Sequence, residues 1–378
     1  MSQRKRVVTL LVSAVASSMR DMVRGVSEYA KEERRWHLVL HLWGQVNENT
    51  VRWINQGDGI IFDAPLRSSD VRSPKWSIPA VGLHNWALAK EVPLVTSNYE
   101  EVGRRAAAYF LEKGLTHLAY LSYASGDPAE TGFREEAGKA DCSVSSHYIG
   151  PGQPELDPAA RKDFIQWLSD LPPPTGLLVR EDFLAQKVMD WIPTEWMPER
   201  LALLGVGNDS IVCDLADPTL SSVDRNARKI GRTAARILDR LMEGEAISPG
   251  PVLLDPGMVI ERQSTGLRYT PDPLVTRAVR LLEETLHEAP KADQVCAHLK
   301  VSRSTLENRF RQTLGHSIWK QRRQLQIERA RYLLSTTTDP MSLIAEQCGF
   351  AHQQHLAEAF AKMVGVPPSR YRAESKAK

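Results

Sequence analysis

The amino-acid sequence predicts an α/β body of two lobes with parallel sheets, followed by an all-α domain that contains two helix-turn-helix units. Residues 1–265 alternate short apolar runs with segments of helical period, which is typical of strand–helix–strand repeats. The stretch from Gln263 to Pro273 is rich in turn residues and has no periodicity, so residues 266–273 are predicted to be a linker. Beyond it, residues 274–376 show helical patterns and no strand-like run.

The strands of the body are predicted from its apolar runs, which begin at Val7, His37, Gly57, Ile78, Val92, His117, Thr175 and Leu201. Segments of helical period lie between them, and the one from Val102 to Gly114 ends on a glycine. So many strands favour two lobes over one sheet, and we expect the second lobe at about residues 123–220. A helix from Arg225 to Met242 is expected to return the chain to the first lobe.

Length and charge distribution support this division. A chain of 378 residues exceeds one typical hydrophobic core. The net charge is only +2, but residues 273–378 contain 17 Lys and Arg against 10 Asp and Glu, a formal charge of +7. The remainder contains 31 basic and 36 acidic residues, a charge of −5. A basic module attached to a mildly acidic body indicates a polyanionic partner.

The start of the chain, M-S-Q-R-K-R followed by an apolar run, is similar to a signal peptide. Because Ser17–Arg20 lead directly into an amphipathic pattern, we interpret the run as a first buried strand. No run reaches the ~18 apolar residues of a membrane span, so no membrane contact is expected. The scattered cysteines indicate a reduced, cytoplasmic compartment, with no metal site and no cofactor. They are Cys142, Cys213, Cys296 and Cys348.

The first helix-turn-helix unit is expected at about residues 293–315. Ser302 is placed to cap its second helix after a short turn. Apolar residues spaced by four, Leu306, Phe310 and Leu314, bury one face of that helix. The side chains projecting from the other face are the first set of candidate DNA contacts: Arg303, Ser304, Glu307, Asn308 and Arg311.

The second unit repeats this plan at about residues 341–364. Gly349 turns the chain, and Leu356, Phe360 and Val364 anchor the second helix. Such a helix enters the major groove, where Gln and Asn pair with adenine edges and Arg pairs with guanine. Its outward candidates are Gln353, Gln354, His355, Ala357 and Glu358.

A helix-forming segment from Ser317 to Leu334 joins the two units. Its length of ~18 residues corresponds to ~27 Å. One turn of DNA measures ~34 Å, so a rigid helix of this length places two recognition helices in successive major-groove segments. Some basic residues of this helix could reach phosphates, although a solvated helix face is the alternative for each: Lys320, Arg322, Arg323, Arg329 and Arg331. Of these, Arg323 is the candidate that we select.

The helical domain resembles the AraC/XylS-type transcription regulators. The resemblance covers about the last 100 residues and is carried by V-S-R-S-T-L-E-N-R-F from Val301, by Gly349-Phe350 and Phe360, and by G-V-P-P-S-R-Y-R from Gly365. It implies two units gripping double-stranded DNA. By position, the implied base contacts are Ser304, Glu307, Asn308, Gln353, Gln354, Ala357 and Glu358. The two glutamates are unfavourable near phosphates, although Glu can accept a hydrogen bond from cytosine.

The body resembles the LacI/GalR-type, periplasmic-binding-protein-like sensors in layout and in short matches such as T-S-N-Y at Thr96 and G-V-G-N-D at Gly205. This resemblance implies a sugar between the lobes, outside the carboxyl ends of the strands. Trp86 is a candidate stacking platform. The implied polar ligand-binding residues are Arg20, Ser97, Asn98, Asp182 and Asn208.

This sequence departs from the sensor pattern at three positions. The family has aspartates where Ser97 and Gly207 stand, and an arginine where Ala129 stands. Serine and glycine cannot accept two sugar hydroxyls as a carboxylate does. Two hypotheses remain open: a different, less polyhydroxylated ligand, or a degenerate pocket that keeps only a dimerisation role.

These observations predict a homodimeric, DNA-binding transcription regulator that controls genes for catabolism of a xylose-like sugar in response to a small ligand. Regulators of this type more commonly activate transcription, through contact with RNA polymerase. We also expect a cytoplasmic, nucleoid-associated location. One alternative is a ligand-independent regulator. Others are a sugar-transport binding protein, which would not explain the basic domain, and an enzyme. The sequence contains no P-loop, G-x-G-x-x-G, G-x-S-x-G or H-E-x-x-H motif, so we expect no enzymatic activity.

Overall fold

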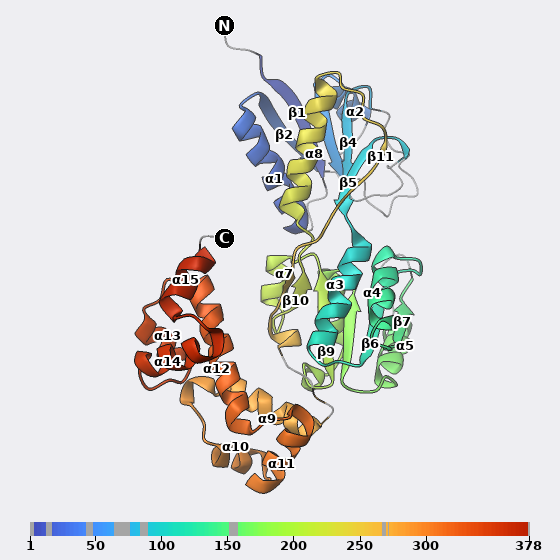
Figure 1. The fold of residues 1–378 in the computed structure, drawn as a ribbon. Helices are drawn as coiled ribbons and strands as arrows, with labels where there is room; N and C mark the ends of the chain where they lie inside the picture. The colour runs from blue at the N-terminus through green and yellow to red at the C-terminus, as the bar shows by residue number, and fades with distance from the viewer. Residues whose placement is uncertain are drawn as a thin grey trace. The chain divides into compact units, whose positions relative to one another are not determined.

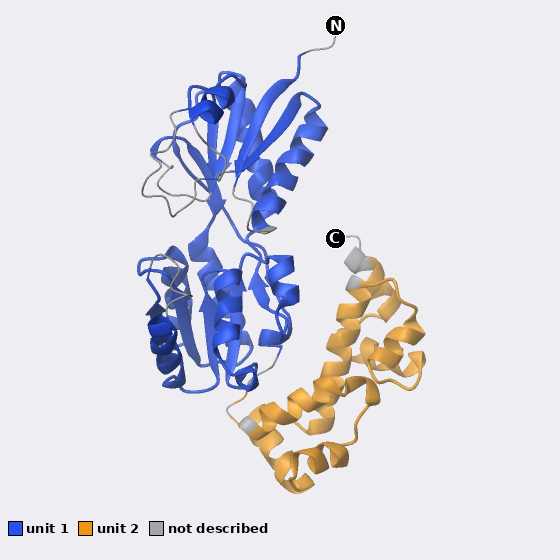
Figure 2. Ribbon diagram, turned by 180° about the vertical axis from the view of Figure 1, so that it is seen from behind, with its two compact units in different colours: residues 1–266 blue, residues 267–378 orange. Residues whose placement is uncertain are grey.

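A computed structural model describes residues 4–12, 17–42, 48–63, 76–83, 90–150, 158–266, 270 and 272–376. The chain divides into two compact units, residues 1–266 and residues 267–378 (Figure 2). Across the described ranges, no helix combines the length and apolar character needed to cross a membrane.

The first unit is built on two sheets, which lie in separate halves of the unit (Figure 1). In spatial order, the described strands of the first sheet are β11 (Gly250–Leu254), β5 (Pro93–Ser97), β4 (Ala80–Leu83), β3 (Gly59–Asp63), β1 (Arg6–Val12) and β2 (Trp36–Leu42). Those of the second sheet are β12 (Val259–Ile260), β10 (Ser221–Val223), β9 (Leu201–Val206), β8 (Thr175–Val179), β6 (His117–Ser122) and β7 (Val144–Tyr148). The strand pairs are parallel, except that β12 runs antiparallel to β10.

Helices complete the two lobes. The first lobe contains α1 (Ser17–Glu33), α2 (Glu48–Ile54) and α8 (Ala227–Met242). The second contains α3 (Tyr99–Glu112), α4 (Pro128–Gly138), α5 (Pro158–Ser169), α6 (Asp182–Trp191) and α7 (Ser210–Leu215). The chain passes between the lobes after β5, after β10 and after β11. These crossings bring residues from distant parts of the sequence to the junction of the lobes.

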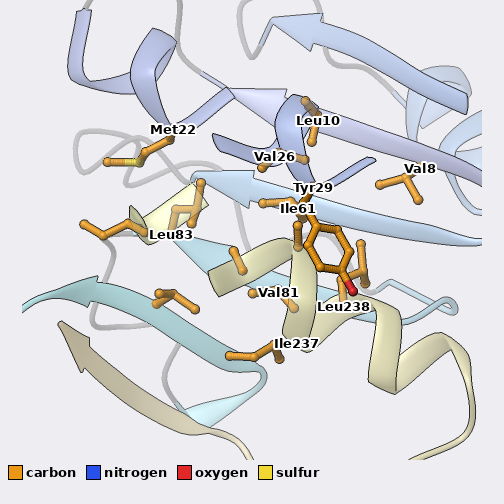
Figure 3. Packing of buried hydrophobic residues seen from close by; sticks show 14 of the residues in the cluster. Val8, Leu10, Met22, Val26, Tyr29, Ile61, Val81, Leu83, Ile237 and Leu238 are labelled. Atoms are coloured by element: carbon orange, nitrogen blue, oxygen red, sulfur yellow. The ribbon is translucent and has the colours of Figure 1, made fainter. Parts of the chain in front are cut away.

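The core of the first lobe forms where α1 and α8 cover the first sheet (Figure 3). Val26 of α1, Leu238 of α8 and Ile61 of β3 are fully buried there. The two helices approach so closely that a Cβ added at Gly25 would lie 2.0 Å from the carbonyl oxygen of Arg228. Glycine is therefore required at this crossing, because any side chain would push the helices apart.

The predicted fold class is confirmed, and the eight predicted strands are present as β1 to β6, β8 and β9. The sequence analysis missed β7, whose residues V-S-S-H-Y are largely polar, and the short strands β10, β11 and β12. The sheet of the second lobe includes β6 and β10, which lie outside the range 123–220. The helix expected from Arg225 begins only at Ala227, because Asn226 has left-handed backbone (φ 56°) and the chain turns there.

The described regular elements of the second unit are all helical. They are α9 (Pro273–Glu284), α10 (Ala292–Leu299), α11 (Arg303–Leu314), α12 (Ile318–Thr336), α13 (Met341–Gln347), α14 (Gln353–Val364) and α15 (Pro368–Lys376), with one 3₁₀ turn (Leu286–Glu288). One core packs Ile318 and Leu325 of α12 against α9, α10 and α11. Another packs Ile327 and Leu334 against α13 and α14. Because α12 contributes to both cores, it holds the two helix-turn-helix units in one rigid framework.

Candidate functional site

Arg225, the second residue after β10, connects the two lobes of the first unit. The Arg225 guanidinium donates from Nη1 to the hydroxyl of Tyr99 (2.6 Å) and from Nη2 to Oγ of Ser18 (2.8 Å). Tyr99 begins α3 in the second lobe, whereas Ser18 lies in α1 of the first. The carbonyl oxygen of Arg225 also accepts a hydrogen bond from Ser97 Oγ at the end of β5 (2.9 Å). Arg225 is therefore held by side chains from both lobes.

A second arginine, Arg180, follows β8 and approaches the same tyrosine. Its guanidinium lies 4.1 Å from the centre of the Tyr99 ring and forms an ion pair with Asp127. Burial lowers the pKa of Arg180, but the neighbouring Tyr99 and Asp127 outweigh this and raise it above its ordinary value. Burial raises the pKa of Tyr99, and the positive charges of Arg225 and Arg180 more than reverse that effect. The junction thus contains two guanidinium groups around one phenol.

Asp182, the first residue of α6, is almost fully buried in the second lobe. Its Oδ1 accepts from Ser222 Oγ (2.6 Å), and its Oδ2 accepts from the Asp209 amide (2.7 Å). Burial raises its pKa to about 6, although these hydrogen bonds oppose the rise. Asp63, at the end of β3, is affected in the same way: burial raises its pKa to about 7 against the attraction of Arg225.

The predicted ligand-binding residues occupy different surroundings. Ser97 is buried and bonded to Arg225, and Asn98 caps α3 by accepting from the Glu101 amide (3.3 Å). Asn208 is linked to Asp182 through Ser222, whose hydroxyl accepts from the Asn208 amide (2.9 Å). Arg20 is exposed on α1 and has no hydrogen bond or ion pair with this group in the described part of the chain, and Trp86 lies outside that part.

The backbone explains why Gly207 cannot simply be replaced by the aspartate of the family pattern. Gly207 has φ 134°, a conformation that side chains with a Cβ rarely adopt. A Cβ there would lie 3.0 Å from Oδ2 of Asp182. Gly207 and Asn208 also line a pocket of about 520 Å³ that is completed by residues of α1 and α8.

Sequence reasoning missed the residues that join the lobes, Tyr99, Arg180 and Arg225. Each lies within two residues of the end of a strand, β5, β8 or β10. Position after a strand was the available signal, since ligands of open α/β sheets bind at strand carboxyl ends. It was not decisive, because Tyr123 and Arg262 also follow strands, β6 and β12.

The first candidate recognition helix is α11. Ser302 caps it as predicted, with its Oγ accepting from the Thr305 amide (3.1 Å). Leu306 and Phe310 are buried as expected. Of the candidate contacts, Glu307 is half-buried and the others are exposed on α11: Arg303, Ser304, Asn308 and Arg311. The guanidinium of Arg303 lies 3.3 Å from Oδ1 of Asp293 at the surface.

The second candidate recognition helix, α14, begins at Gln353 after the left-handed turn at Gly349 (φ 69°). Leu356 and Phe360 bury its inner face. Exposed on its first turns are Gln353, Gln354, His355 and Glu358.

Arg323 of α12 lies between aromatic side chains rather than opposite a carboxylate. Its guanidinium is 5.3 Å from the ring centre of Trp319 and 4.9 Å from that of Phe350. Burial, and secondly the charge of Arg322, lowers its pKa below the ordinary value. It remains a cation at neutral pH.

Comparison with known proteins finds a matching family model for each of the two units. A family model described as a periplasmic binding protein-like domain matches residues 107–265, and one described as a helix-turn-helix domain matches residues 295–374. The xylose operon regulatory protein of Escherichia coli (strain K12) is 28% identical over 98% of each chain. The solved structure of xylose-binding transcription activator xylR covers 99% of each chain with a TM-score of 0.72 and 28% identity.

The chain thus combines an AraC-type helix-turn-helix domain with a periplasmic-binding-protein-like sensor, which is the domain arrangement of a transcription regulator. The helical unit of the regulator is also similar to the arabinose operon regulatory protein of Escherichia coli (strain K12), at 38% identity over 79 residues. That match covers 21% of this chain and 27% of that protein. The first unit shares its fold with a periplasmic binding protein/LacI transcriptional regulator from Alkaliphilus metalliredigens QYMF complexed with D-xylulofuranose. That structure aligns with 69% of this chain and 99% of its own, at a TM-score of 0.53 and 21% identity.

Among the described residues, no three His, Cys, Asp or Glu side chains are grouped as metal ligands. The polar groups at the lobe junction are instead hydrogen-bond donors and acceptors, namely guanidinium, phenol, hydroxyl and carboxyl groups. Such groups can bind a hydroxylated small molecule. They can also hold the lobes in a fixed relation.

Proposed function

We propose that this regulator binds double-stranded operator DNA through residues 274–376, and that a xylose-like sugar bound by residues 1–265 controls the binding. The observation that carries the proposal is the junction at Arg225, where side chains of both lobes meet at strand ends. A ligand that contacts these groups on both lobes binds one arrangement of the lobes better than another. It therefore shifts the equilibrium between the arrangements. The similarity over the whole chain to the xylose operon regulatory protein supports a sugar of this class.

The proposed DNA contacts are the exposed side chains of α11 and α14 together with Arg323 of α12. Polar, uncharged side chains at the start of α14 suit hydrogen-bond readout of base edges. Arg303 and Arg311 of α11 suit guanine or phosphate. The complete proposed set is Arg303, Ser304, Glu307, Asn308, Arg311, Arg323, Gln353, Gln354, His355 and Glu358.

The proposed ligand contacts are Asp182 and Asn208, joined through Ser222, with Ser97 and Asn98 at the start of α3. Arg20, exposed on α1, and Trp86 remain in the proposed set on the strength of the sequence. We add Arg225 and Tyr99, because they lie at the junction itself.

A thermal-shift titration of the full chain with pentoses, hexoses and their acids tests the ligand claim. A ligand at about 100 times its Kd stabilises the folded state by ~2.7 kcal/mol. For domains of this size, that corresponds to a rise of several degrees in Tm. The stabilising ligand should then change the affinity of the chain for its operator, selected from genomic fragments. If no operator fragment is enriched over random DNA, the DNA-binding claim is wrong.

A second candidate function is ligand-independent regulation by a sensor that serves only dimerisation. The observation that favours it is that expected anchors already have internal partners. Ser97 donates to Arg225, both Asp182 oxygens accept hydrogen bonds, and Oδ1 of Asn208 accepts from Arg262 (3.1 Å). Under this proposal, the titration produces no shift in Tm, and operator binding is the same with and without every sugar tested.

The regulator is further proposed to act as a homodimer, because paired DNA-binding units match paired half-sites. Light scattering of the full chain tests this. We also propose a cytoplasmic, nucleoid-associated location, contact with RNA polymerase as an activator, and no enzymatic activity. In vitro transcription from the selected operator distinguishes activation from repression.

A further inference from the structure

The start of α12 lies between the two candidate recognition helices. Trp319 and Arg322 line a pocket of about 270 Å³ together with residues of α10 and α11, including Glu307. The same two residues line a groove of about 770 Å³ on the side of α14, together with Arg323 and Glu358. The first turns of α12 therefore form the surface that separates the two helix-turn-helix units.

The groove beside α14 contains a cation, Arg323, that has no acidic partner in the part of the chain that the structure describes. Among the described residues, Arg323 has no hydrogen bond or ion pair, and its guanidinium packs on Trp319 and Phe350. The floor of the groove holds Gln326, which is 1% exposed. Its Nε2 donates to the Gly349 carbonyl (2.9 Å), while its Oε1 is buried without a partner in the described chain.

The charges around this groove are unequal. Lys320, Arg322, Arg323 and Lys362 line it, and Glu358 is the acidic residue among its lining residues. Arg322 is partly engaged, because its Nη1 donates to the carbonyl oxygens of Ala289 and Pro290 (3.0 and 2.7 Å). An excess of fixed cations with few internal acceptors is complementary to an anion.

The rim of the groove is apolar. Trp319 is 58% exposed and Met363 is 45% exposed. A nucleic-acid backbone alternates anionic phosphates with less polar sugars, so it matches cations set between apolar side chains. A carboxylate-rich peptide would satisfy the cations but would leave these side chains uncovered.

We propose that this groove holds the phosphodiester backbone of the duplex between the two major-groove segments read by α11 and α14. The inference rests on the proposed binding of DNA. Arg323 meets phosphate there, with its guanidinium oriented by Trp319 and Phe350. Glu358 faces the same backbone and weakens binding to every sequence, instead of selecting cytosine.

Glu307 takes an equivalent place on the other side of α12. Its Oε2 is buried without a partner in the described chain, and it lines the pocket that contains Arg303 and Arg322. Both acidic candidates of the recognition helices thus line cavities that Arg322 of α12 also lines. Their location explains how two glutamates are tolerated in a surface that meets DNA.

The test measures binding of the full chain to a fluorescent random-sequence duplex of about three helical turns. Anisotropy is recorded over a range of salt concentrations for wild type, Arg323→Gln and Arg329→Gln. Arg329 is the matched control, because it also lies on α12 over an aromatic ring, Tyr332, but lines neither cavity. Arg323→Gln should weaken binding about three- to tenfold at ~0.1 M salt and lower the salt slope by about 1. Arg329→Gln should do neither.

Glu358→Gln is measured on the random duplex and on the selected operator. Removal of the negative charge should tighten binding to both about two- to fivefold. Loss of affinity for the operator alone would mean that Glu358 reads a base, and would overturn the proposal. Arg323→Lys keeps the charge and should retain most of the affinity, which separates a phosphate contact from a packing role.

The outcomes also separate this inference from the proposed function. If wild type binds DNA and Arg323→Gln behaves like Arg329→Gln, the groove does not hold the backbone, although the chain is a DNA-binding protein. If wild type binds neither the random duplex nor any genomic fragment, the proposed function itself is wrong.

Discussion

The guanidinium of Arg225 donates a 2.6 Å hydrogen bond to the hydroxyl of Tyr99, across 126 positions of sequence. A second hydrogen bond, to Ser18, links the same guanidinium to the other lobe. A ligand that binds one arrangement of the lobes better than another shifts their equilibrium, so a side chain bonded to both lobes is well placed to transmit ligand binding.

Tyr99→Phe removes the acceptor and leaves a partly buried charged donor with one partner fewer. Hydrogen bonds to charged groups contribute ~1.5–3 kcal/mol, against ~0.5–1.5 kcal/mol for neutral ones. The matched control is Tyr109→Phe, since the Tyr109 hydroxyl lies 2.7 Å from the neutral hydroxyl of Thr265. Urea unfolding of the first unit within the full chain should show the larger loss for Tyr99→Phe. Equal losses would mean that the charged junction makes no special contribution.

The raised pKa of Asp182 predicts that the stability of the folded chain depends on pH. The folded pKa of Asp182 is raised to about 6 from an ordinary 3.8, mainly by burial, so the folded state holds the proton more tightly than the unfolded state. The stabilisation is therefore fully present below about pH 4 and is lost as pH rises through about 6. The loss is on the order of 3 kcal/mol.

The measurement is the free energy of unfolding of wild type minus that of Asp182→Asn, at pH values from 4 to 8. This difference should fall with rising pH and level off above about pH 7. Asp182→Asn also loses a hydrogen bond from Ser222 or from the Asp209 amide. This loss changes the difference in free energy by the same amount at every pH, so its pH dependence is unaffected. A difference that is flat or rises with pH would contradict the raised pKa.

Gly207→Ala should destabilise the sensor by ~1–3 kcal/mol, because a Cβ at φ 134° is strained and crowds Asp182. The control is Gly138→Ala at the end of α4, where an added Cβ meets nothing within 4 Å. That control should be neutral or stabilising. Thermal unfolding of both variants measures the contrast, and equal behaviour would show that the Gly207 backbone relaxes freely.

Replacement of Gln353 and Gln354 by alanine tests base readout by α14. Affinity for the selected operator should fall by at least ~1 kcal/mol, and affinity for random DNA should stay nearly constant. Gln347→Ala on α13 serves as the control, because Gln347 lies outside the candidate contact set. If both affinities fall together, the two glutamines contact phosphates and do not read bases.

The second unit was largely predictable from sequence, because its signals are local. The spacing of Leu306 and Phe310 defines one buried face, and Ser302 caps the helix a few residues away. Gly349, with positive φ, marks the equivalent turn of the second unit. These features depend on residues within one or two helical turns, and such interactions are encoded by spacing and residue type.

The sequence by itself determined the alternation of strands and helices in the sensor, both helix-turn-helix units and the exposed polar start of α14. Only the tertiary structure decided that Ser97 is buried against the backbone of Arg225, and that Tyr99 lies between Arg180 and Arg225. It also located both glutamates of the recognition helices beside basic residues of α12. The physical reason is that these partners come from distant segments, which meet only where the chain crosses between lobes or where separate helices pack on α12.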